Sequence, residues 1–124
     1  MDGGGAPLSV VLMTAPDGET GERIARALVE ERLIACANLV PGVTSVYRWE
    51  GEVRADAEHL VVMKTRRELL ERLFARAAEL HPYSVPELIA VDVQAGSRVY
   101  CRWVCGETVG ADDGGGVPQA DPSV

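Results

Sequence analysis

The sequence predicts a single α+β domain, and three observations support this prediction. The chain has 124 residues, which is the length of one ordinary domain. Hydrophobic residues make up 47% of it and charged residues 25%, as in globular proteins with a buried core. Apolar runs with strand character alternate with stretches of helical periodicity. We expect the folded domain over residues 8–109, flanked by disordered tails at 1–7 and at 110–124, the second of them acidic.

The first elements are predicted to be a strand and a helix. Residues 8–15 form a short, Val-rich apolar run, which is typical of a strand buried on both faces. Pro16 and Asp17 then begin a helix, with Asp17 as the expected N-cap. No glycine follows the apolar stripe of this helix, so its end is placed only loosely, near Arg32.

A long β-hairpin is predicted to follow the first helix. Residues 35–49 have strand character, interrupted at Pro41-Gly42, where a bulge or bend is expected because proline cannot donate to a central ladder. Glu50-Gly51 is a turn signal, and residues 52–64 return as a second strand. Both arms exceed the usual strand length of five or six residues.

The second half repeats the pattern of helix and strand. Thr65 and Glu68 have the spacing of a capping box, which predicts that Thr65 begins the second helix. Pro82 ends this helix and forces His81 out of helical geometry. Residues 87–93 form a β-rich run.

A short C-terminal helix is predicted to complete the domain. It is expected to begin at Gly96-Ser97 and to end at Gly106 in a left-handed cap. The whole order is β-α-β-β-α-β plus a terminal helix, which is the ferredoxin-like, split βαβ topology with both main helices on one face of an antiparallel sheet. Residues 43–49 and 60–63 are too apolar to leave in water on the other face, and this predicts an oligomer.

Charge and cysteine content exclude several functional classes. A net charge of −7 disfavours nucleic acid and anionic membranes, and suits cations. Three cysteines are too few and too widely spaced for a secreted disulfide framework. The first residues have neither the basic start of a signal peptide nor a membrane span. These features predict a reducing, cytoplasmic setting.

The polar and aromatic residues of the body follow long, fixed spacings. The segments that carry them are Cys36-Ala37-Asn38, Pro41-Gly42, Ser45-x-Tyr47-x-Trp49-Glu50-Gly51, Glu58, Lys64-Thr65, His81-Pro82-Tyr83-x-x-Pro86-Glu87 and Gly96-x-x-x-Tyr100-x-x-Trp103. Together they resemble the CutA divalent-cation-tolerance family. The resemblance covers nearly the whole body and implies a ferredoxin-like subunit that forms a tight homotrimer, in which long hairpins pair with neighbouring subunits. It also implies a relation to divalent cations, chiefly copper, and no agreed enzymatic reaction.

Cys36 and His81 are the candidate metal ligands. Cys36 stands at the cysteine position of the family, and a thiolate favours Cu(I) or Zn(II). The imidazole of His81 suits copper and zinc and lies in a predicted loop. Each also has a structural interpretation, Cys36 as a small buried residue and His81 as a helix-end cap. Met13 replaces a second cysteine that some relatives carry, which weakens any copper site built on that cysteine.

The remaining soft side chains are more typical of packing. Cys101 and Cys105 are four residues apart on one helix face, and no further Cys or His follows to complete a zinc site. His59 lies inside a predicted strand and is expected at a surface or interface.

A set of polar and aromatic residues is predicted to line a cleft between subunits. In this cleft Lys64 and Glu58 are placed to pair, and the aromatic rings would recognise a small ligand; the alternative is a wet trimer interface with aromatic anchors. The set consists of Tyr47, Trp49, Glu50, Glu58, Lys64, Tyr83, Glu87, Tyr100 and Trp103.

The sequence contains no recognised enzyme signature. It lacks a phosphate-binding glycine loop before a helix and a Gly-x-Ser-x-Gly elbow, and only a Cys36–His81 dyad is conceivable. We therefore expect a non-enzymatic, trimeric protein that binds copper or another divalent cation, with no obligatory cofactor. The alternative is a regulatory or interaction trimer that binds a small molecule or protein partner in its clefts.

Overall fold

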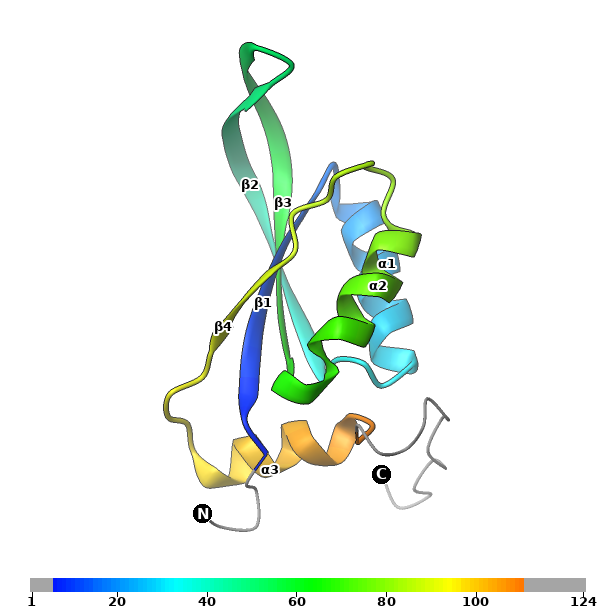
Figure 1. Cartoon of the computed structure of the whole chain (residues 1–124), viewed down its shortest axis with the longest axis vertical. Coiled ribbons are helices and arrows are strands. Elements are labelled where there is room, and N and C mark those ends of the chain that lie inside the picture. The colour runs from blue at the N-terminus through cyan, green and yellow to red at the C-terminus, as the bar shows by residue number, and fades with distance from the viewer. Residues whose placement is uncertain (1–5, 111–124) are drawn as a thin grey trace.

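The computed structural model describes residues 6–110 of the chain. Most of the two predicted tails therefore lies outside the described residues. The described part forms an α+β domain with a sheet on one side and two helices packed against it (Figure 1). In chain order the elements are β1 (Leu8–Ala15), α1 (Gly18–Glu30), β2 (Cys36–Trp49), β3 (Glu52–Arg66), the 3-10 turn η1 (Arg67–Leu69), α2 (Leu70–Leu80), β4 (Ile89–Asp92) and α3 (Arg98–Glu107).

The four strands form one antiparallel sheet in the order β2-β3-β1-β4. Helices α1 and α2 lie side by side on one face, and α3 crosses the end of the sheet opposite the hairpin tip (Figure 1). The predicted α+β class and antiparallel sheet are confirmed. No helix within residues 6–110 has both the length and the apolar character needed to cross a membrane.

Helix α1 begins as predicted. The Asp17 carboxylate accepts a hydrogen bond of 2.7 Å from the backbone N–H of Thr20, which satisfies one unpaired donor of the first turn. The helix ends at Glu30, close to the expected end, and Arg32 takes a left-handed φ of 61°. Arg32 thus adopts the conformation that a glycine cap would otherwise supply.

The β2–β3 hairpin is also as predicted. Its register shifts between Val40 and Val43, so the expected bulge falls at Pro41-Gly42, where Gly42 has a φ of +78°. At the tip, Glu50 and Gly51 both have positive φ, 51° and 81°, as a two-residue hairpin turn that matches the strand twist requires. The hairpin extends well beyond the helices (Figure 1).

The predicted capping box at Thr65 is wrong. Thr65 lies inside β3, opposite Ser9, and its buried hydroxyl donates to the Leu33 carbonyl oxygen at 2.6 Å. Thr65 therefore belongs to a strand, although the local sequence pattern predicted that it begins a helix. Helix α2 instead follows η1 and has no side-chain N-cap.

The predicted left-handed cap at Gly106 is also wrong. Gly106 lies within α3, and the helix ends one residue later with Thr108 in an extended conformation. The Thr108 hydroxyl donates to the Val104 carbonyl oxygen at 2.9 Å, so a side chain satisfies part of the helix end. The last strand, β4, is shorter than the predicted run 87–93, while the predicted end of α2 before Pro82 is confirmed.

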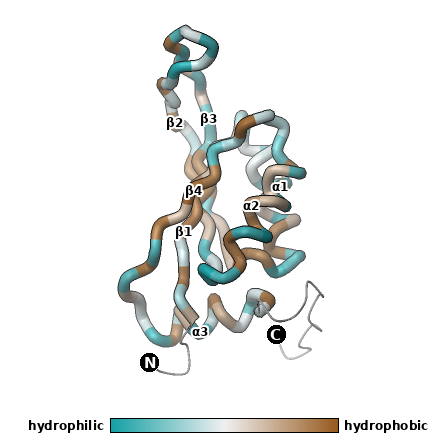
Figure 2. Tube along the Cα trace, viewed as in Figure 1, coloured by the Kyte–Doolittle hydropathy of each residue, from teal (hydrophilic) through white to brown (hydrophobic). Residues whose placement is uncertain are grey.

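The main core lies between the sheet and helices α1 and α2. Alternate residues of the two central strands point into it, and Met13 and Met63 are fully buried there. A second, smaller cluster lies under α3, where Val104 packs with Leu8 and Ala35. Figure 2 shows hydrophobic residues concentrated where the strands cross, and more polar ones towards the hairpin tip.

The other side of the sheet has little cover, and we call it the open face. By strand alternation it carries Leu60 and Val62 of β3, which are half-buried, and the exposed residues Ile89 and Val91 of β4. The run 60–63 is therefore divided between two faces, because its alternate residues are buried beneath the helices. Within residues 6–110, α3 covers only one end of the open face.

Candidate functional site

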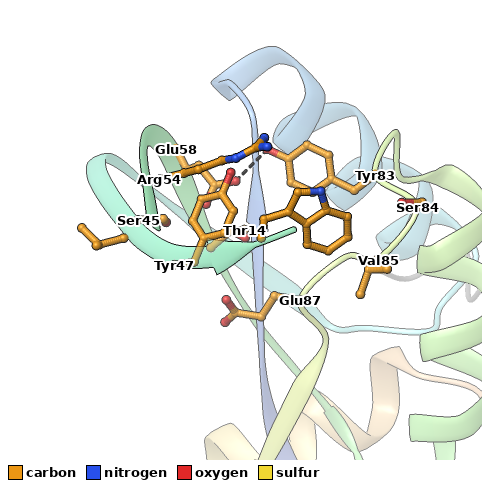
Figure 3. Close-up of a pocket in the computed structure, with 11 residues that line it drawn as sticks. Thr14, Ser45, Tyr47, Arg54, Glu58, Tyr83, Ser84, Val85 and Glu87 are labelled. Atoms are coloured by element: carbon orange, nitrogen blue, oxygen red, sulfur yellow. Dashed lines mark hydrogen bonds between the residues drawn. The ribbon is translucent and has the colours of Figure 1, made fainter. Parts of the chain in front are cut away.

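A cleft of about 500 Å³ lies at the hairpin end of the open face. One wall is the hairpin, the other is the segment that connects α2 to β4, and the end of β1 contributes to the floor (Figure 3). Within the described part of the chain it is lined by Thr14, Ser45, Val46, Tyr47, Trp49, Arg54, Glu58, Tyr83, Ser84, Val85 and Glu87.

Glu58 forms the buried acidic part of this cleft. Its side chain accepts a hydrogen bond of 2.7 Å from the Tyr83 hydroxyl, shown as a dashed line in Figure 3. Burial, together with this carboxylate neighbour, raises the pKa of Tyr83 above its ordinary value. The phenol therefore keeps its proton and remains a donor to Glu58.

His81 holds the wall that carries Tyr83. One ring nitrogen, Nε2, lies 2.8 Å from the Thr14 carbonyl oxygen, and the other, Nδ1, accepts the backbone N–H of Tyr83 at 3.1 Å. This pattern assigns the proton to Nε2, because a carbonyl can only accept. The His81 and Tyr83 rings also pack with centroids 4.7 Å apart. His81 is buried, and a metal ion could bind only after one of these bonds breaks.

The hairpin wall is ordered by a second phenol–carboxylate pair. Tyr47 of β2 donates to Asp56 of β3, and this bond raises the pKa of Tyr47. Arg54 lies opposite Tyr47, with its guanidinium 3.7 Å from Glu50 and 3.9 Å from Glu52. Those two contacts are long and lie near the turn, so they fix Arg54 only weakly.

A separate polar group lies at the other end of the sheet, beside α3. The Cys36 thiol and the Tyr100 hydroxyl share a hydrogen bond of 3.3 Å, and this bond, with burial, raises the pKa of Tyr100. Lys64, opposite Cys36, donates to Asn38. Trp103 packs beside Tyr100 with ring centroids 5.6 Å apart.

The predicted cleft set is thus divided between two places in one chain. Tyr47, Trp49, Glu58, Tyr83 and Glu87 meet in the cleft. The other predicted members lie elsewhere, with Glu50 in the hairpin turn and Lys64, Tyr100 and Trp103 near Cys36. Lys64 and Glu58 are six residues apart along β3, or about 20 Å, so they do not pair within one chain.

Cys36 and His81 are likewise separated. In the sheet, Cys36 of β2 lies opposite Lys64 of β3, which in turn lies opposite Val10 of β1. His81 instead contacts Thr14, which is four residues further along β1 than Val10. This separation is roughly 13 Å along the strand alone, and two ligands of one ion, or a Cys–His dyad, must lie within a few ångströms. Among residues 6–110, no group of three or more His, Cys, Asp or Glu side chains is placed to hold a metal.

The other soft side chains pack against their neighbours. Met13 lies in the main core. Cys101 and Cys105 pack against the small cluster under α3, as predicted for these two residues. Sequence reasoning missed Arg54 and Asp56, although both alternate with Glu58 on β3. That alternation, read against the hairpin register, is the signal that would have found them.

Comparisons with known proteins agree with one another. A family model described as "CutA1 divalent ion tolerance protein" matches residues 9–107. The divalent-cation tolerance protein CutA of Thermus thermophilus is 50% identical over 95 residues, covering 77% of this chain and 92% of that protein. The chloroplastic CutA of Arabidopsis thaliana is 45% identical over 102 residues, covering 82% of this chain, which spans only 56% of the plant protein.

Solved structures give the same result. The divalent cation tolerance protein from Thermus thermophilus has a TM-score of 0.80 at 48% identity, covering 82% of this chain and 99% of that one. CutA1 from Oryza sativa has a TM-score of 0.82 at 43% identity, covering 84% of this chain and 95% of that one.

Proposed function

The chain belongs to the CutA1 divalent ion tolerance family, and from this premise we propose that it acts in divalent-cation tolerance as a homotrimeric, non-enzymatic binding protein. The observation that carries the proposal is the open face of the sheet. Val40, Ile89 and Val91 are exposed there beside the half-buried Leu60 and Val62. A contiguous apolar face of this kind is typical of an interface between subunits.

The hairpin supports assembly as well. Strand β2 is an edge strand of 14 residues that extends beyond the helices, and long unpaired edges are a hazard unless another chain covers them. Packing three sheets around one axis would bury the open faces and pair these edges. The strand order, with α1 and α2 on one face, supports the ferredoxin-like topology for each subunit.

Metal binding by Cys36 and His81 is the part of the proposal that comes from the sequence. In one subunit the donor set around Cys36 is incomplete, since the hydrogen-bond partner of its thiol is the Tyr100 hydroxyl and His81 is distant. We therefore propose that a copper or zinc ion bound by Cys36 takes its further ligands from another subunit. A thiolate would supply a soft ligand for Cu(I) or Zn(II).

The test is titration of the reduced, purified protein with Cu(I), Cu(II) and Zn(II). We expect stoichiometric uptake that Cys36→Ala abolishes, with a smaller effect of His81→Ala because the His81 ring already makes two hydrogen bonds. Weak, unsaturating uptake that is equal in the wild type and in a variant carrying both Cys36→Ala and His81→Ala would contradict a defined site.

The non-enzymatic character and the compartment are also proposals. The separation of Cys36 from His81 removes, within one subunit, the nucleophile–base pair that the sequence allowed. The three cysteines are free, which fits a reducing, cytoplasmic setting.

A second function is favoured by the cleft. Aromatic and polar side chains from three segments converge there around a buried carboxylate. Concave sites of this composition and size are typical of small-ligand binding. We propose a regulatory role through a bound small molecule as the alternative to metal tolerance.

A further inference from the structure

We propose that the cleft binds a small organic cation, an ammonium compound whose charged head contacts Glu58 and whose body packs against Tyr47, Trp49 and Tyr83. The proposal rests on the small-ligand function of the cleft and not on metal tolerance. Three features of the described residues carry it: a buried carboxylate that makes no ion pair within its own chain, a set of aromatic faces, and a negative balance of charge.

Glu58 is the first feature. Glu58 is only 8% exposed. Within residues 6–110 its carboxylate nevertheless accepts only one hydrogen bond, from the neutral Tyr83 hydroxyl, and makes no ion pair. A carboxylate can accept about four hydrogen bonds, and a buried one is costly without a counter-charge. An ammonium group in the cleft would supply both the charge and the missing donors.

The aromatic walls are the second feature. The Tyr47 and Tyr83 hydroxyls already donate hydrogen bonds to Asp56 and Glu58, respectively. The parts of these side chains that remain for a ligand are therefore mainly the ring faces. Trp49 lines the same cleft and is partly exposed. Ring faces attract cations and are the usual means of holding alkylammonium groups.

The balance of charge is the third feature. Glu58 and Glu87 come from different elements on opposite sides of the cleft (Figure 3), and the cation that faces them is Arg54. Arg54 is shared with Glu50 and Glu52 at the turn. The lining therefore disfavours anions, and the net charge of −7 further favours the approach of cations.

A bare divalent metal ion fits this cleft less well than an organic cation. No trio of His, Cys, Asp or Glu within residues 6–110 is placed to replace the water shell of a metal ion. The cleft of about 500 Å³ is instead large enough for an organic molecule, and its valines, Val46 and Val85, add apolar surface.

Calorimetric titration with benzylammonium and with its neutral analogue benzyl alcohol tests the proposal. We expect saturable binding of benzylammonium with one site per subunit, and at least tenfold weaker binding of benzyl alcohol. Glu58→Gln should weaken benzylammonium at least tenfold, and Trp49→Leu should weaken it severalfold. The matched control, Glu30→Gln, removes an exposed carboxylate at the end of α1 and should leave binding unchanged.

If Glu58→Gln does not fold, Glu87→Gln provides the test, because Glu87 is exposed and its replacement should not disturb folding. We expect this variant to bind benzylammonium more weakly than the wild type, with a smaller loss than for Glu58→Gln. Benzyl alcohol binding as tightly as benzylammonium, equal binding by folded Glu58→Gln and wild type, or no saturable binding at all would overturn the proposal. Metal uptake and particle mass measured on the same samples separate the outcomes. Normal metal uptake and particle mass in a wild-type protein that does not bind benzylammonium would refute the organic-cation site alone.

Discussion

The two faces of the sheet have similar side chains and opposite surroundings. On the face beneath α1 and α2, Val11 and Met63 have no exposed surface. On the open face, Val40 is 42% exposed, Ile89 54% and Val91 55%. A strand that is apolar on both sides is normally covered on both sides. One chain therefore covers only one face of its sheet, and in the proposed homotrimer other copies would cover the open face.

The largest effect is expected from a cavity on the covered face. Met63→Ala should lower the free energy of unfolding by about 2–5 kcal/mol, because Met63 is fully buried and the helices above it can collapse only partly. Urea unfolding followed by circular dichroism, at one fixed protein concentration, measures this loss. A loss below about 1 kcal/mol would show that the covered face is loosely packed.

A charged side chain introduced on the open face should prevent assembly without preventing folding. Leu60→Asp is expected to reduce the particle mass to that of one chain at micromolar concentration, while far-UV circular dichroism keeps the α+β signal, because Leu60 lies outside the main core. The control is Val29→Asp on α1, where the exposed valine lies away from the sheet and the mass should stay unchanged. Unaltered mass in Leu60→Asp would remove this face from the interface.

Two glycines outside the main core give smaller effects of opposite sign. Gly51→Ala should destabilise the protein by about 1 kcal/mol, because Gly51 has a φ of +81° although there is room for a Cβ atom. Gly106→Ala should stabilise it by about 0.5–1 kcal/mol, because Gly106 lies within α3 and an added Cβ meets nothing within 4 Å. Thermal unfolding of both variants checks these signs, and equal shifts would contradict the backbone argument.

The smallest expected effect is a pH dependence of stability that comes from Asp17, the N-cap of α1. Hydrogen bonds from Thr20 lower the pKa of Asp17 below 3.8 in the folded protein. The unfolded chain therefore binds this proton first, so the stabilisation is complete above about pH 4 and is lost as the pH falls through the folded pKa. Asp17→Asn should flatten the decline of melting temperature between pH 4 and pH 2. Parallel declines in both proteins would show that the cap carries no pH-dependent stability.

Local patterns predicted those parts of the fold that depend on neighbouring residues. The strand Leu8–Ala15, the cap at Asp17 and the turn at Gly51 follow from apolar runs, capping chemistry and backbone freedom. The prediction failed at Thr65, where pairing with β1 outweighed a valid capping pattern. It failed at Gly106 because the Thr108 side chain, rather than a left-handed residue, satisfies part of the helix end.

The candidate site was harder to predict because it depends on distances across the sheet. Tyr83 and Glu58 were both identified, but their hydrogen bond joins residues 25 positions apart and follows from how the connecting segment docks through His81. Cys36 and His81 are grouped as candidate ligands by their chemical type and their positions in the family pattern, neither of which gives a distance. The strand register, which the sequence does not give directly, separates them.

The mass of the purified wild-type protein in solution, measured by light scattering across a range of concentrations, tests the central claim most directly. An open apolar face that other copies cover predicts a particle of three chains, each of 13.3 kDa, that persists on dilution to micromolar concentration. A particle of one chain at these concentrations would contradict the account, because the exposed face of the sheet would then be stable in water on its own.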